Sequence, residues 1–372
     1  MAEIEIGLGK SGRRAYRLDE VTIVPTRRTR DAELVDTSWE LDAYRFELPI
    51  LASAMDSVVS PATAVALGGM GAAGVLHLEG LWTRHDDADA VLAELAEIDD
   101  EVEATRRMRE VYSVPVRPEL VVQRIGQIKD AGVLSCAAVT PPRTEALMPS
   151  IREAELDLLV IQGSVLSAEH VSTHDEPLNL KTYIRQLDIP VVVGGCASYQ
   201  AALHLMRTGA AAVLVGVGSG STCTTGDVVG VGMPQATAIA DAKAARMRHL
   251  DETGVYVHVI ADGGMASGGD IARAVVCGAD AVMVGGPLAA ASDAPGRGYH
   301  WGMSAPHETL PKGTRVAVEP KGSLAEVLLG PAVDLSGRTN LVGALRAAMA
   351  ACGYDDLKEF QKADLMVTGM GA

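Results

Sequence analysis

A cysteine stands in a glycine-rich segment that directly follows an apolar run. Residues 216–225 read GVGSGSTCTT, and residues 211–215, AAVLV, precede them. Glycine backbone adopts positive φ at little cost, so the N–H groups of such a loop can converge on an anion. Ser219 and Ser221 would add hydroxyl donors to the same anion. The pattern predicts that Cys223 is a nucleophile held beside a phosphate-binding loop.

A purely structural role fits the same ten residues. A glycine-rich turn after a strand often binds nothing, and a single cysteine is often a small buried apolar residue. The choice depends on whether the fold brings other polar side chains to Cys223, so the elements that position it come next.

Eight short apolar runs recur along the chain, and most are separated by segments of helical periodicity such as 198–208, 235–250 and 270–277. Eight strands alternating with helices predict an α/β protein with a closed (β/α)8 TIM barrel, because an open doubly wound sheet usually has fewer strands. The runs are residues 48–52, 74–76, 135–139, 158–161, 191–193, 212–215, 257–260 and 281–284.

In such a barrel the residues that follow the strands meet at one face, which carries the active site. Each of them also has a structural interpretation, since Asp262 could cap a helix and the glycines could form turns. Their convergence on one face favours a site. The residues are Ser53, His77, Thr140, Gln162, Gly194, the Cys223 loop, Asp262 and Gly285.

The composition agrees with buried parallel strands. Of 372 residues, 48% are hydrophobic but only 2 are Phe, so the core must be built from Ala, Val, Leu, Ile and Met. Small and branched residues of this kind suit strands that are covered on both faces. We therefore expect one barrel domain that spans residues 1–372, with an N-terminal extension.

The charge and the cysteines exclude several classes of protein. A formal net charge of −16 argues against nucleic acid as a partner, whereas backbone amides can still bind a small phosphorylated ligand. The five cysteines include no CxxC pair, which predicts neither a disulfide framework nor a zinc site. Without a long apolar segment, we expect a cytoplasmic protein with no membrane partner.

Three segments fall outside the strand and helix alternation. Residues 86–109 are rich in Ala, Leu and Glu, and we expect one or two exposed helices that act as solvated connectors. Residues 296–322 are interrupted by proline and glycine, which predicts a loop beside the mouth of the barrel. Residues 340–357 have a helical pattern.

Six motifs resemble those of the IMP dehydrogenase and GMP reductase family, and the resemblance covers nearly the whole chain. It is greatest with the short actinobacterial and cyanobacterial branch that lacks CBS domains, because only a short helical insert, about 81–120, follows the second strand. The motifs are LASAMD at 51–56, GVLH at 74–77, GSGSTCTT at 218–225, MPQATA at 233–238, IADGG at 260–264 and MVGGPLAA at 283–290.

The resemblance implies a purine-nucleotide oxidoreductase in which the Cys223 thiolate attacks C2 of the purine. In a dehydrogenase, IMP then gives hydride to NAD, and water hydrolyses the thioimidate to XMP. In a reductase, the thiol displaces ammonia from GMP and NADPH reduces the adduct to IMP. We expect IMP oxidation with NAD, with NADP not excluded; the alternatives are a GMP reductase and a catalytically weak nucleotide-binding regulator.

The resemblance also assigns residues to the substrate. Asp262 would accept both ribose hydroxyls, and Thr225 would position the water or ammonia beside Cys223. The substrate residues that it implies are Ser53, Met55, Ser221, Asp262, Gly263, Gly264, Gly285, Gly286, Gly302, Met303 and Ser304.

Cofactor, ion and assembly follow from the same resemblance. Gln162, Gly163, Ser164 and Gly216 would contact the cofactor. The backbone carbonyls of Gly218, Gly220 and Cys223 would hold potassium. Relatives form homotetramers or homo-octamers, and we expect the same assembly here.

Several positions depart from the family pattern. The family aspartate after the fourth strand is Gln162, its asparagine after the fifth is Cys196, and its arginine in the sixth is Leu214. The active-site flap, about 303–316, is short, since Gly313 is only ten positions after Met303.

Because the flap is short, the sequence does not decide which group transfers the proton in the hydrolysis or ammonia step. Lys312 stands where relatives carry Glu or Gln, and an ammonium lacks the proton-accepting role of the carboxylate that handles ammonia in reductases, which weakens the reductase interpretation. A neutral Lys312, or Arg315, could instead act as the base for hydrolysis. A solvated lysine without a catalytic part is the alternative.

Overall fold

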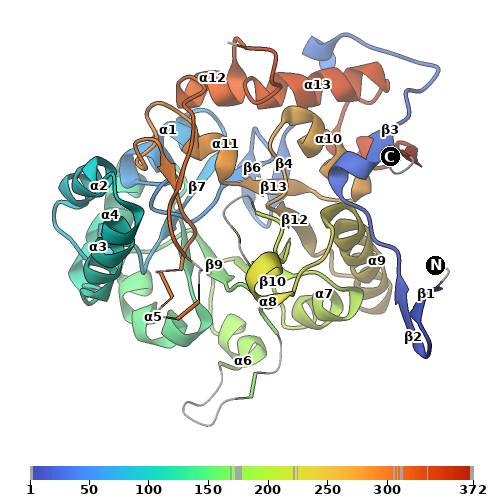
Figure 1. Ribbon diagram of the computed structural model, residues 1–372. Coiled ribbons are helices and arrows are strands. Elements are labelled where there is room, and N and C mark those ends of the chain that lie inside the picture. The colour runs from blue at the N-terminus through green and yellow to red at the C-terminus, as the bar shows by residue number, and fades with distance from the viewer. Residues whose placement is uncertain are drawn as a thin grey trace.

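A closed barrel of eight parallel strands forms the centre of the protein (Figure 1). The computed structural model describes residues 3–167, 170–171, 178–220, 223, 225–304, 306–307, 309–310, 313–332 and 334–368. The eight predicted strands and the (β/α)8 fold are confirmed. In chain order the barrel strands are β6 (Ile50–Ala52), β7 (Ala73–His77), β8 (Cys136–Val139), β9 (Leu158–Gln162), β10 (Val191–Cys196), β11 (Ala212–Val215), β12 (His258–Asp262) and β13 (Ala281–Val284).

Strand residues alternate between the barrel interior and the surrounding helices. At Gly74 in β7, an added Cβ would come within 2.6 Å of the Ala64 backbone in α1 (Pro61–Gly69), so this position faces the helices. Because side chains alternate along a strand, Val75 and His77 face the interior. His77 thus ends β7 at the mouth of the barrel.

Helices enclose the barrel, and local signals set their ends. Serine side chains cap α1, α7 and α10 by accepting a backbone N–H from the first helical turn, and Gly254 ends α9 with a φ of +72°. No helix in the described ranges has the length and apolar character required to cross a membrane. The main outer helices are α1, α4 (Pro118–Asp130), α5 (Thr144–Glu153), α7 (Tyr199–Met206), α9 (Gln235–Thr253), α10 (Gly268–Cys277) and α13 (Leu341–Ala351).

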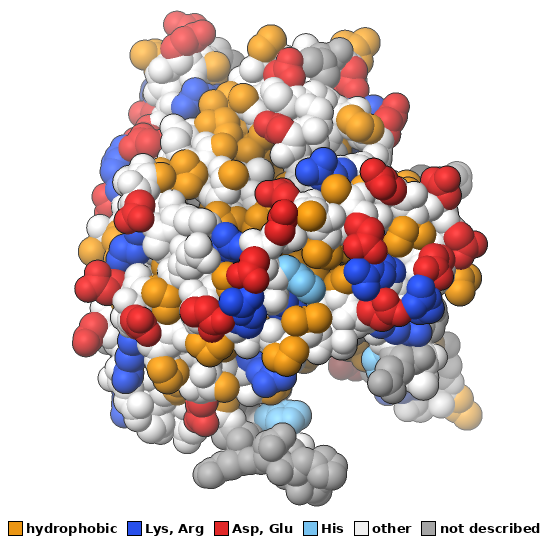
Figure 2. Space-filling model, turned by 90° about the vertical axis from the view of Figure 1, so that its left-hand side faces the viewer, with side chains coloured by type: hydrophobic (Ala, Val, Ile, Leu, Met, Phe, Trp, Pro, Cys, Tyr) orange, Lys and Arg blue, Asp and Glu red, His pale blue; other side chains and the backbone are white. Residues whose placement is uncertain are grey.

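Two further helices follow β7, namely α2 (Ala88–Glu97) and α3 (Glu101–Ser113), and they lie beside α4 (Figure 1). Our expectation of solvated connectors is wrong for their inner faces. Leu92, Leu95, Met108 and Val111 are buried, because apolar residues recur every three or four positions on one side of each helix. On the outer surface of this region, basic and acidic side chains are interspersed (Figure 2).

Short antiparallel hairpins complete the fold. β14 (Tyr299–His300) pairs with β15 (Val316–Ala317) within the segment expected as a loop. At the amino end of the barrel, β4 (Trp39–Leu41) pairs with β5 (Tyr44–Phe46), and the ring of Trp39 meets the edge of His258 at the start of β12. This second hairpin therefore covers the end of the barrel opposite the mouth.

Candidate active site

A cavity of about 840 Å³ opens at the carboxyl ends of the barrel strands. Most predicted site residues that the structure describes line it, although Gly194 and Arg315 do not, and Ser221 and Lys312 lie outside the described residues. The fold thus brings together residues at the ends of five barrel strands, β6, β9, β11, β12 and β13, and of the β14 hairpin. They are Ser53, Met55, Gln162, Gly163, Ser164, Gly216, Gly218, Gly220, Cys223, Thr225, Asp262, Gly263, Gly264, Gly285, Gly286, Gly302, Met303 and Ser304.

Cys223 lies next to a hydroxyl group inside this cavity. Its Sγ is 3.2 Å from Oγ1 of Thr225, the buried first residue of α8 (Thr225–Val229). The backbone N–H of Cys223 donates to the carbonyl of Gly220 at 2.9 Å. Cys223 is partly exposed and lines the cavity, so a molecule bound there can reach its thiol. A thiol and a hydroxyl can therefore act on the same atom of a bound molecule.

The loops after β11 and β12 are packed so closely that they fix one another. A Cβ on Gly216 would come within 2.0 Å of the Asp262 carbonyl oxygen, so only glycine allows this approach. The Ser219 hydroxyl donates to the same carbonyl at 2.8 Å. The side-chain amide of Gln235 bridges the two strands, donating to Val215 O at 2.7 Å and to Asp262 O at 3.2 Å.

The carboxylate of Asp262 is held deep in the cavity with an amide partner. Gln162 Nε2 donates to Asp262 Oδ2 at 2.9 Å. Burial raises the pKa of Asp262 to about 7, and the hydrogen bond from Gln162 opposes that rise. Gln162 Oε1 is buried, and no partner for it is found among the described residues. A two-oxygen acceptor of this kind suits a vicinal diol.

Glycines also leave room on the side formed by β13 and β6. A Cβ on Gly285 would lie 3.3 Å from both Met55 Sδ and Ser53 Oγ, tighter than ordinary van der Waals contact. Gly286 follows it as the first residue of α11 (Gly286–Ala289). The chain thus presents backbone N–H groups here without side chains in the way, as an approaching phosphate requires.

The potassium expectation concerns the loop that carries Cys223. Three of its residues, 221, 222 and 224, lie outside the described part of the chain. Gly220 O already accepts the Cys223 N–H. A potassium site formed by the carbonyls of Gly218, Gly220 and Cys223 therefore stays a prediction.

Another wall of the cavity contains side chains that sequence reasoning did not assign to the site. Glu79, Arg84 and Tyr112 line it together with His77 and Thr140. Glu79 Oε1 accepts the backbone N–H of Thr140 at 2.6 Å, and the Arg84 guanidinium donates to the Glu79 carbonyl at 2.9 Å. The position of His77 at the end of a strand was the signal available in the sequence, whereas nothing local pointed to Tyr112.

Tyr112 connects α3 to the barrel through a buried chain of hydrogen bonds. Its hydroxyl donates to Asp56 Oδ2 at 2.6 Å and accepts from Trp301 Nε1 at 2.7 Å. Burial raises the pKa of Asp56 to about 6, although the Tyr112 hydrogen bond favours the carboxylate. A residue of the helical segment after β7 therefore shapes the active-site wall.

Arg315 does not reach the cavity, so the hypothesis that it acts as a base is wrong. It is 4% exposed, and its guanidinium donates to the carbonyls of Leu95 and Ile98 at the end of α2. The same group lies 3.3 Å from Glu101 and stacks 3.8 Å above the ring of Tyr299. These partners occupy the guanidinium as a bridge between the β14 hairpin and α2 and α3.

At two further positions that depart from the family pattern, the side chain does not form part of the cavity wall. Cys196 at the end of β10 is buried, and burial raises the pKa of its thiol to about 12. Leu214 in β11 is buried as well, and a Cβ on Gly194 would come within 2.4 Å of its Cβ. Cys196 and Leu214 are therefore packing residues here.

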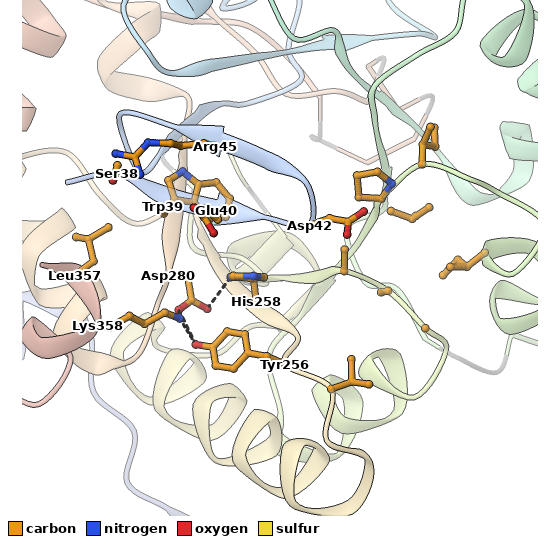
Figure 3. Close-up of a pocket in the computed structure, with 18 of the residues that line it drawn as sticks. Ser38, Trp39, Glu40, Asp42, Arg45, Tyr256, His258, Asp280, Leu357 and Lys358 are labelled. Atoms are coloured by element: carbon orange, nitrogen blue, oxygen red, sulfur yellow. Dashed lines mark hydrogen bonds and ion pairs between the residues drawn. The ribbon is translucent and has the colours of Figure 1, made fainter. Parts of the chain in front are cut away.

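A second cavity, of about 1010 Å³, lies at the opposite end of the barrel (Figure 3). Trp39, His258 and Lys358 are among the side chains that line it, and Asp280 lies at its inner wall. In (β/α)8 proteins the carboxyl end carries the chemistry, and the amino end contributes stability.

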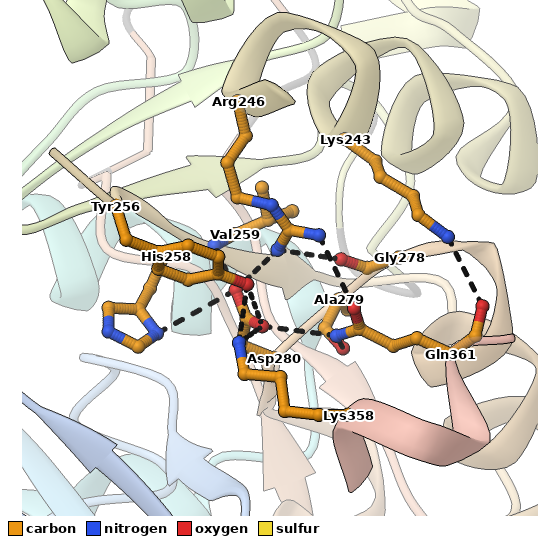
Figure 4. Close-up of polar contacts among 10 residues, drawn as sticks. All are labelled: Lys243, Arg246, Tyr256, His258, Val259, Gly278, Ala279, Asp280, Lys358 and Gln361. Atoms are coloured by element: carbon orange, nitrogen blue, oxygen red, sulfur yellow. Dashed lines mark hydrogen bonds and ion pairs between the residues drawn. The ribbon is translucent and has the colours of Figure 1, made fainter. Parts of the chain in front are cut away.

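Asp280 is the centre of a buried polar network at that end (Figure 4). It is 2% exposed and accepts hydrogen bonds from Arg246, Tyr256, Lys358, Gln361 and the backbone of Val259. Burial alone would raise the pKa of Asp280, but Arg246 and Lys358 lower it to about 2. Arg246 and Lys358 compensate the charge of this carboxylate. Because Asp280 joins α9, β13 and the C-terminal segment, its role is structural.

Comparisons with known proteins point to a single family. Residues 15–371 match the family model described as IMP dehydrogenase / GMP reductase domain. An uncharacterized oxidoreductase of Mycolicibacterium smegmatis is 50% identical over 372 residues, covering 98% of this chain and 99% of its own. The inosine-5'-monophosphate dehydrogenase of Methanocaldococcus jannaschii is 26% identical, covering 94% of this chain and 92% of its own.

A solved structure resembles the whole chain. The IMP dehydrogenase/GMP reductase-like protein of Corynebacterium glutamicum superposes with a TM-score of 0.91 at 44% identity, covering 98% of this chain and 97% of that one. With the family model matched over nearly every residue, this chain belongs to the IMP dehydrogenase / GMP reductase family of oxidoreductases.

Proposed function

We propose that this protein exchanges hydride at C2 of a purine nucleotide through a covalent bond to Cys223. The observation that carries the proposal is the meeting, in one cavity, of the Cys223 thiol, the Thr225 hydroxyl and the Asp262 carboxylate. A thiol serves as the nucleophile, a hydroxyl beside it orients the group that enters or leaves C2, and a carboxylate holds the ribose.

The remaining walls suit the other parts of a nucleotide. Backbone amides at Gly263, Gly264, Gly285 and Gly286 bind the phosphate, because the absence of side chains permits close approach. The loop from Gly302 to Ser304 contacts the purine edge. Ser53 and Met55 pack against the nucleotide from β6.

The side of the cavity formed by β9 fits a nicotinamide cofactor. Gln162, Gly163, Ser164 and Gly216 line it, and the buried Oε1 of Gln162 is available to accept a hydroxyl hydrogen. NAD or NADP would supply hydride exchange at purine C2. Gln162 holds the ribose of the cofactor, at the position where the family has an aspartate. Gly216 allows the neighbouring loops to pack closely, so this side of the cavity stays narrow.

The leading direction is the oxidation of IMP to XMP. In balance, IMP, NAD⁺ and water yield XMP, NADH and a proton. Support comes from position 312, where lysine replaces the group that would take part in the release of ammonia.

A specific observation favours GMP reduction as the second candidate. There, GMP, NADPH and two protons yield IMP, NADP⁺ and ammonium, so no water has to be activated. Arg315, one of the two groups considered for water activation, is occupied by Leu95, Ile98 and Glu101. Because Arg315 is not free to activate water, the case for hydrolysis is weaker, and the case for reduction is unaffected.

Both directions are tested with the purified protein in potassium buffer. NADH formation from IMP and NAD, and NADPH or NADH consumption with GMP, are followed by absorbance at 340 nm. Steady turnover in one direction that is lost in Cys223→Ala supports the proposal and selects the direction. No turnover in either, with IMP binding retained in calorimetry, would overturn it in favour of a nucleotide-binding regulator. Light scattering in the same buffer tests the predicted homotetramer or homo-octamer.

A further inference from the structure

Among the residues that the structure describes, none is a hydrogen-bond partner of His77, although His77 lines the active-site cavity. The side chain is 2% exposed, and neither Nδ1 nor Nε2 has a partner within the described ranges. Alternation along β7, fixed by the contact of Gly74 with α1, directs His77 into the barrel mouth. An unmet buried polar group is unfavourable, so such a group is expected to be satisfied when a ligand binds.

The charge state of His77 restricts the ligand that it can take. Burial and, to a smaller extent, Arg84 lower the pKa of His77 to about 3, so the imidazole is neutral at physiological pH. A neutral imidazole offers one N–H donor and one bare nitrogen acceptor. It does not offer the positive charge that would attract a phosphate. An uncharged group of amide type is its natural partner.

The order of strands places His77 between the walls assigned to substrate and to cofactor. In the closed barrel of eight, β7 is four strands from β11, so His77 lies across the mouth from the Cys223 loop. On one side is β6, which carries Ser53 and Met55, and on the other are β8 and β9, the latter ending in Gln162. A ring stacked over purine C2, opposite Cys223, would be next to His77.

Elimination leaves one neutral amide for this position. Under the function proposed above, Gly302 to Ser304 take the purine edge, Asp262 takes the ribose and the glycines take the phosphate. We propose that His77 hydrogen-bonds the carboxamide of the nicotinamide ring and so fixes which face of that ring meets purine C2. This inference rests on the proposed function and adds a residue to its cofactor site.

Binding of ligands that differ by the nicotinamide tests the proposal without turnover. NADH and NADPH are titrated by fluorescence, and ADP-ribose, which lacks the nicotinamide, by calorimetry, each with saturating IMP. We expect His77→Leu to weaken binding of the preferred reduced cofactor about tenfold, equivalent to about 1.4 kcal/mol. The dissociation constants of ADP-ribose and IMP should change less than twofold.

The matched variant is His77→Asn, which keeps one donor and one acceptor in a smaller side chain. It should recover most of the lost cofactor affinity, whereas a merely structural histidine would show no such rescue. Unchanged NADH and NADPH affinity in His77→Leu, or an equal loss for ADP-ribose or IMP, would overturn the proposal. Failure of the wild-type protein to bind either reduced cofactor would instead refute the proposed function itself.

A measurement on the wild-type protein covers the case in which His77→Leu does not fold. With ¹⁵N-labelled histidine, the ring resonances of His77, assigned by their absence in His77→Asn, should move on addition of NADH or NADPH with IMP. ADP-ribose with IMP should leave them in place. Equal movement with both ligands would show that His77 does not contact the nicotinamide.

Discussion

The side-chain amide of Gln162 donates a hydrogen bond to Asp262 Oδ2 at 2.9 Å and so joins the end of β9 to the end of β12. Gln162 belongs to the side assigned to the cofactor, and Asp262 to the side assigned to the substrate. The amide also favours the charged form of a carboxyl group whose pKa burial raises to about 7. This hydrogen bond thus directly links the wall assigned to the cofactor to the carboxylate assigned to the ribose.

Nucleoside affinity should rise with pH through about 7. Ribose hydroxyls donate to a carboxylate, so below the pKa of Asp262 binding has to expel a proton. Inosine, which has no phosphate to titrate, should bind about tenfold or more weakly at pH 5.5 than at pH 8 in calorimetry. Asp262→Asn should bind weakly at both values, and Gln162→Leu should move the midpoint upward. Equal wild-type affinity at both values would contradict the assignment.

Asp262 should also make the ligand-free protein less stable as pH rises. Its pKa is raised from 3.8 to about 7 in the native state, so its favourable contribution is complete below about pH 4 and is lost as pH rises through 7. Relative to Asp262→Asn, the wild-type free energy of unfolding should fall by on the order of 2–4 kcal/mol between pH 4 and pH 8. Urea titrations at both pH values measure the free energy of unfolding of each protein. If the wild type and Asp262→Asn differ by the same amount at both pH values, the prediction is contradicted.

Replacing Cys223 should remove chemistry and leave binding. In Cys223→Ala, turnover should fall below detection, because no other thiol lines the described part of the cavity, while the dissociation constant of IMP changes less than threefold. Cys352→Ala, at the end of α13, is the matched control and should keep full activity. Residual turnover of Cys223→Ala near the wild-type rate would exclude the covalent mechanism.

Arg315 should matter for stability rather than for chemistry. Arg315→Met removes a buried guanidinium that joins the β14 hairpin to α2 and α3, and we expect the free energy of unfolding to fall by about 2–4 kcal/mol. IMP affinity should stay within threefold of wild type. Chemical denaturation and calorimetry are the measurements. A stable variant that accumulates covalent adduct would restore Arg315 as the base.

Tyr112→Phe isolates one hydrogen bond in the active-site wall. The ring is kept, but Asp56 loses its hydroxyl donor and Trp301 loses its acceptor, so we expect a loss of about 1–3 kcal/mol of stability. Urea denaturation measures the loss. Tyr44→Phe is the control, since that hydroxyl is in no hydrogen bond among the described residues and the stability should not change. Equal effects of the two substitutions would mean that the buried hydrogen bonds of Tyr112 contribute nothing to stability.

The convergence of the candidate site was accessible from the sequence because the barrel imposes it. Eight apolar runs of strand length predicted parallel strands, and parallel strands in a closed barrel end at one face. Gln162 and Asp262 come within two residues of the end of a run, and Cys223 lies in the loop that begins after another, so their meeting followed from periodicity. The glycine loops were also readable, because close approach of backbone requires the absence of a Cβ.

Partners that depend on how distant side chains pack were not accessible in this way. Gln162 and Asp262 are 100 positions apart, and their hydrogen bond depends on the register of β9 and β12. Arg315 is drawn from the cavity by carbonyls at the end of α2, and Tyr112 enters the wall from a segment taken for a connector. The sequence by itself determined the barrel, its catalytic end and the residues at its strand ends, because periodicity and glycine placement are local properties. Only the tertiary structure decided which polar groups are paired and which, like His77, are buried without a partner in the described part of the chain, because that depends on the packing of elements far apart in the sequence.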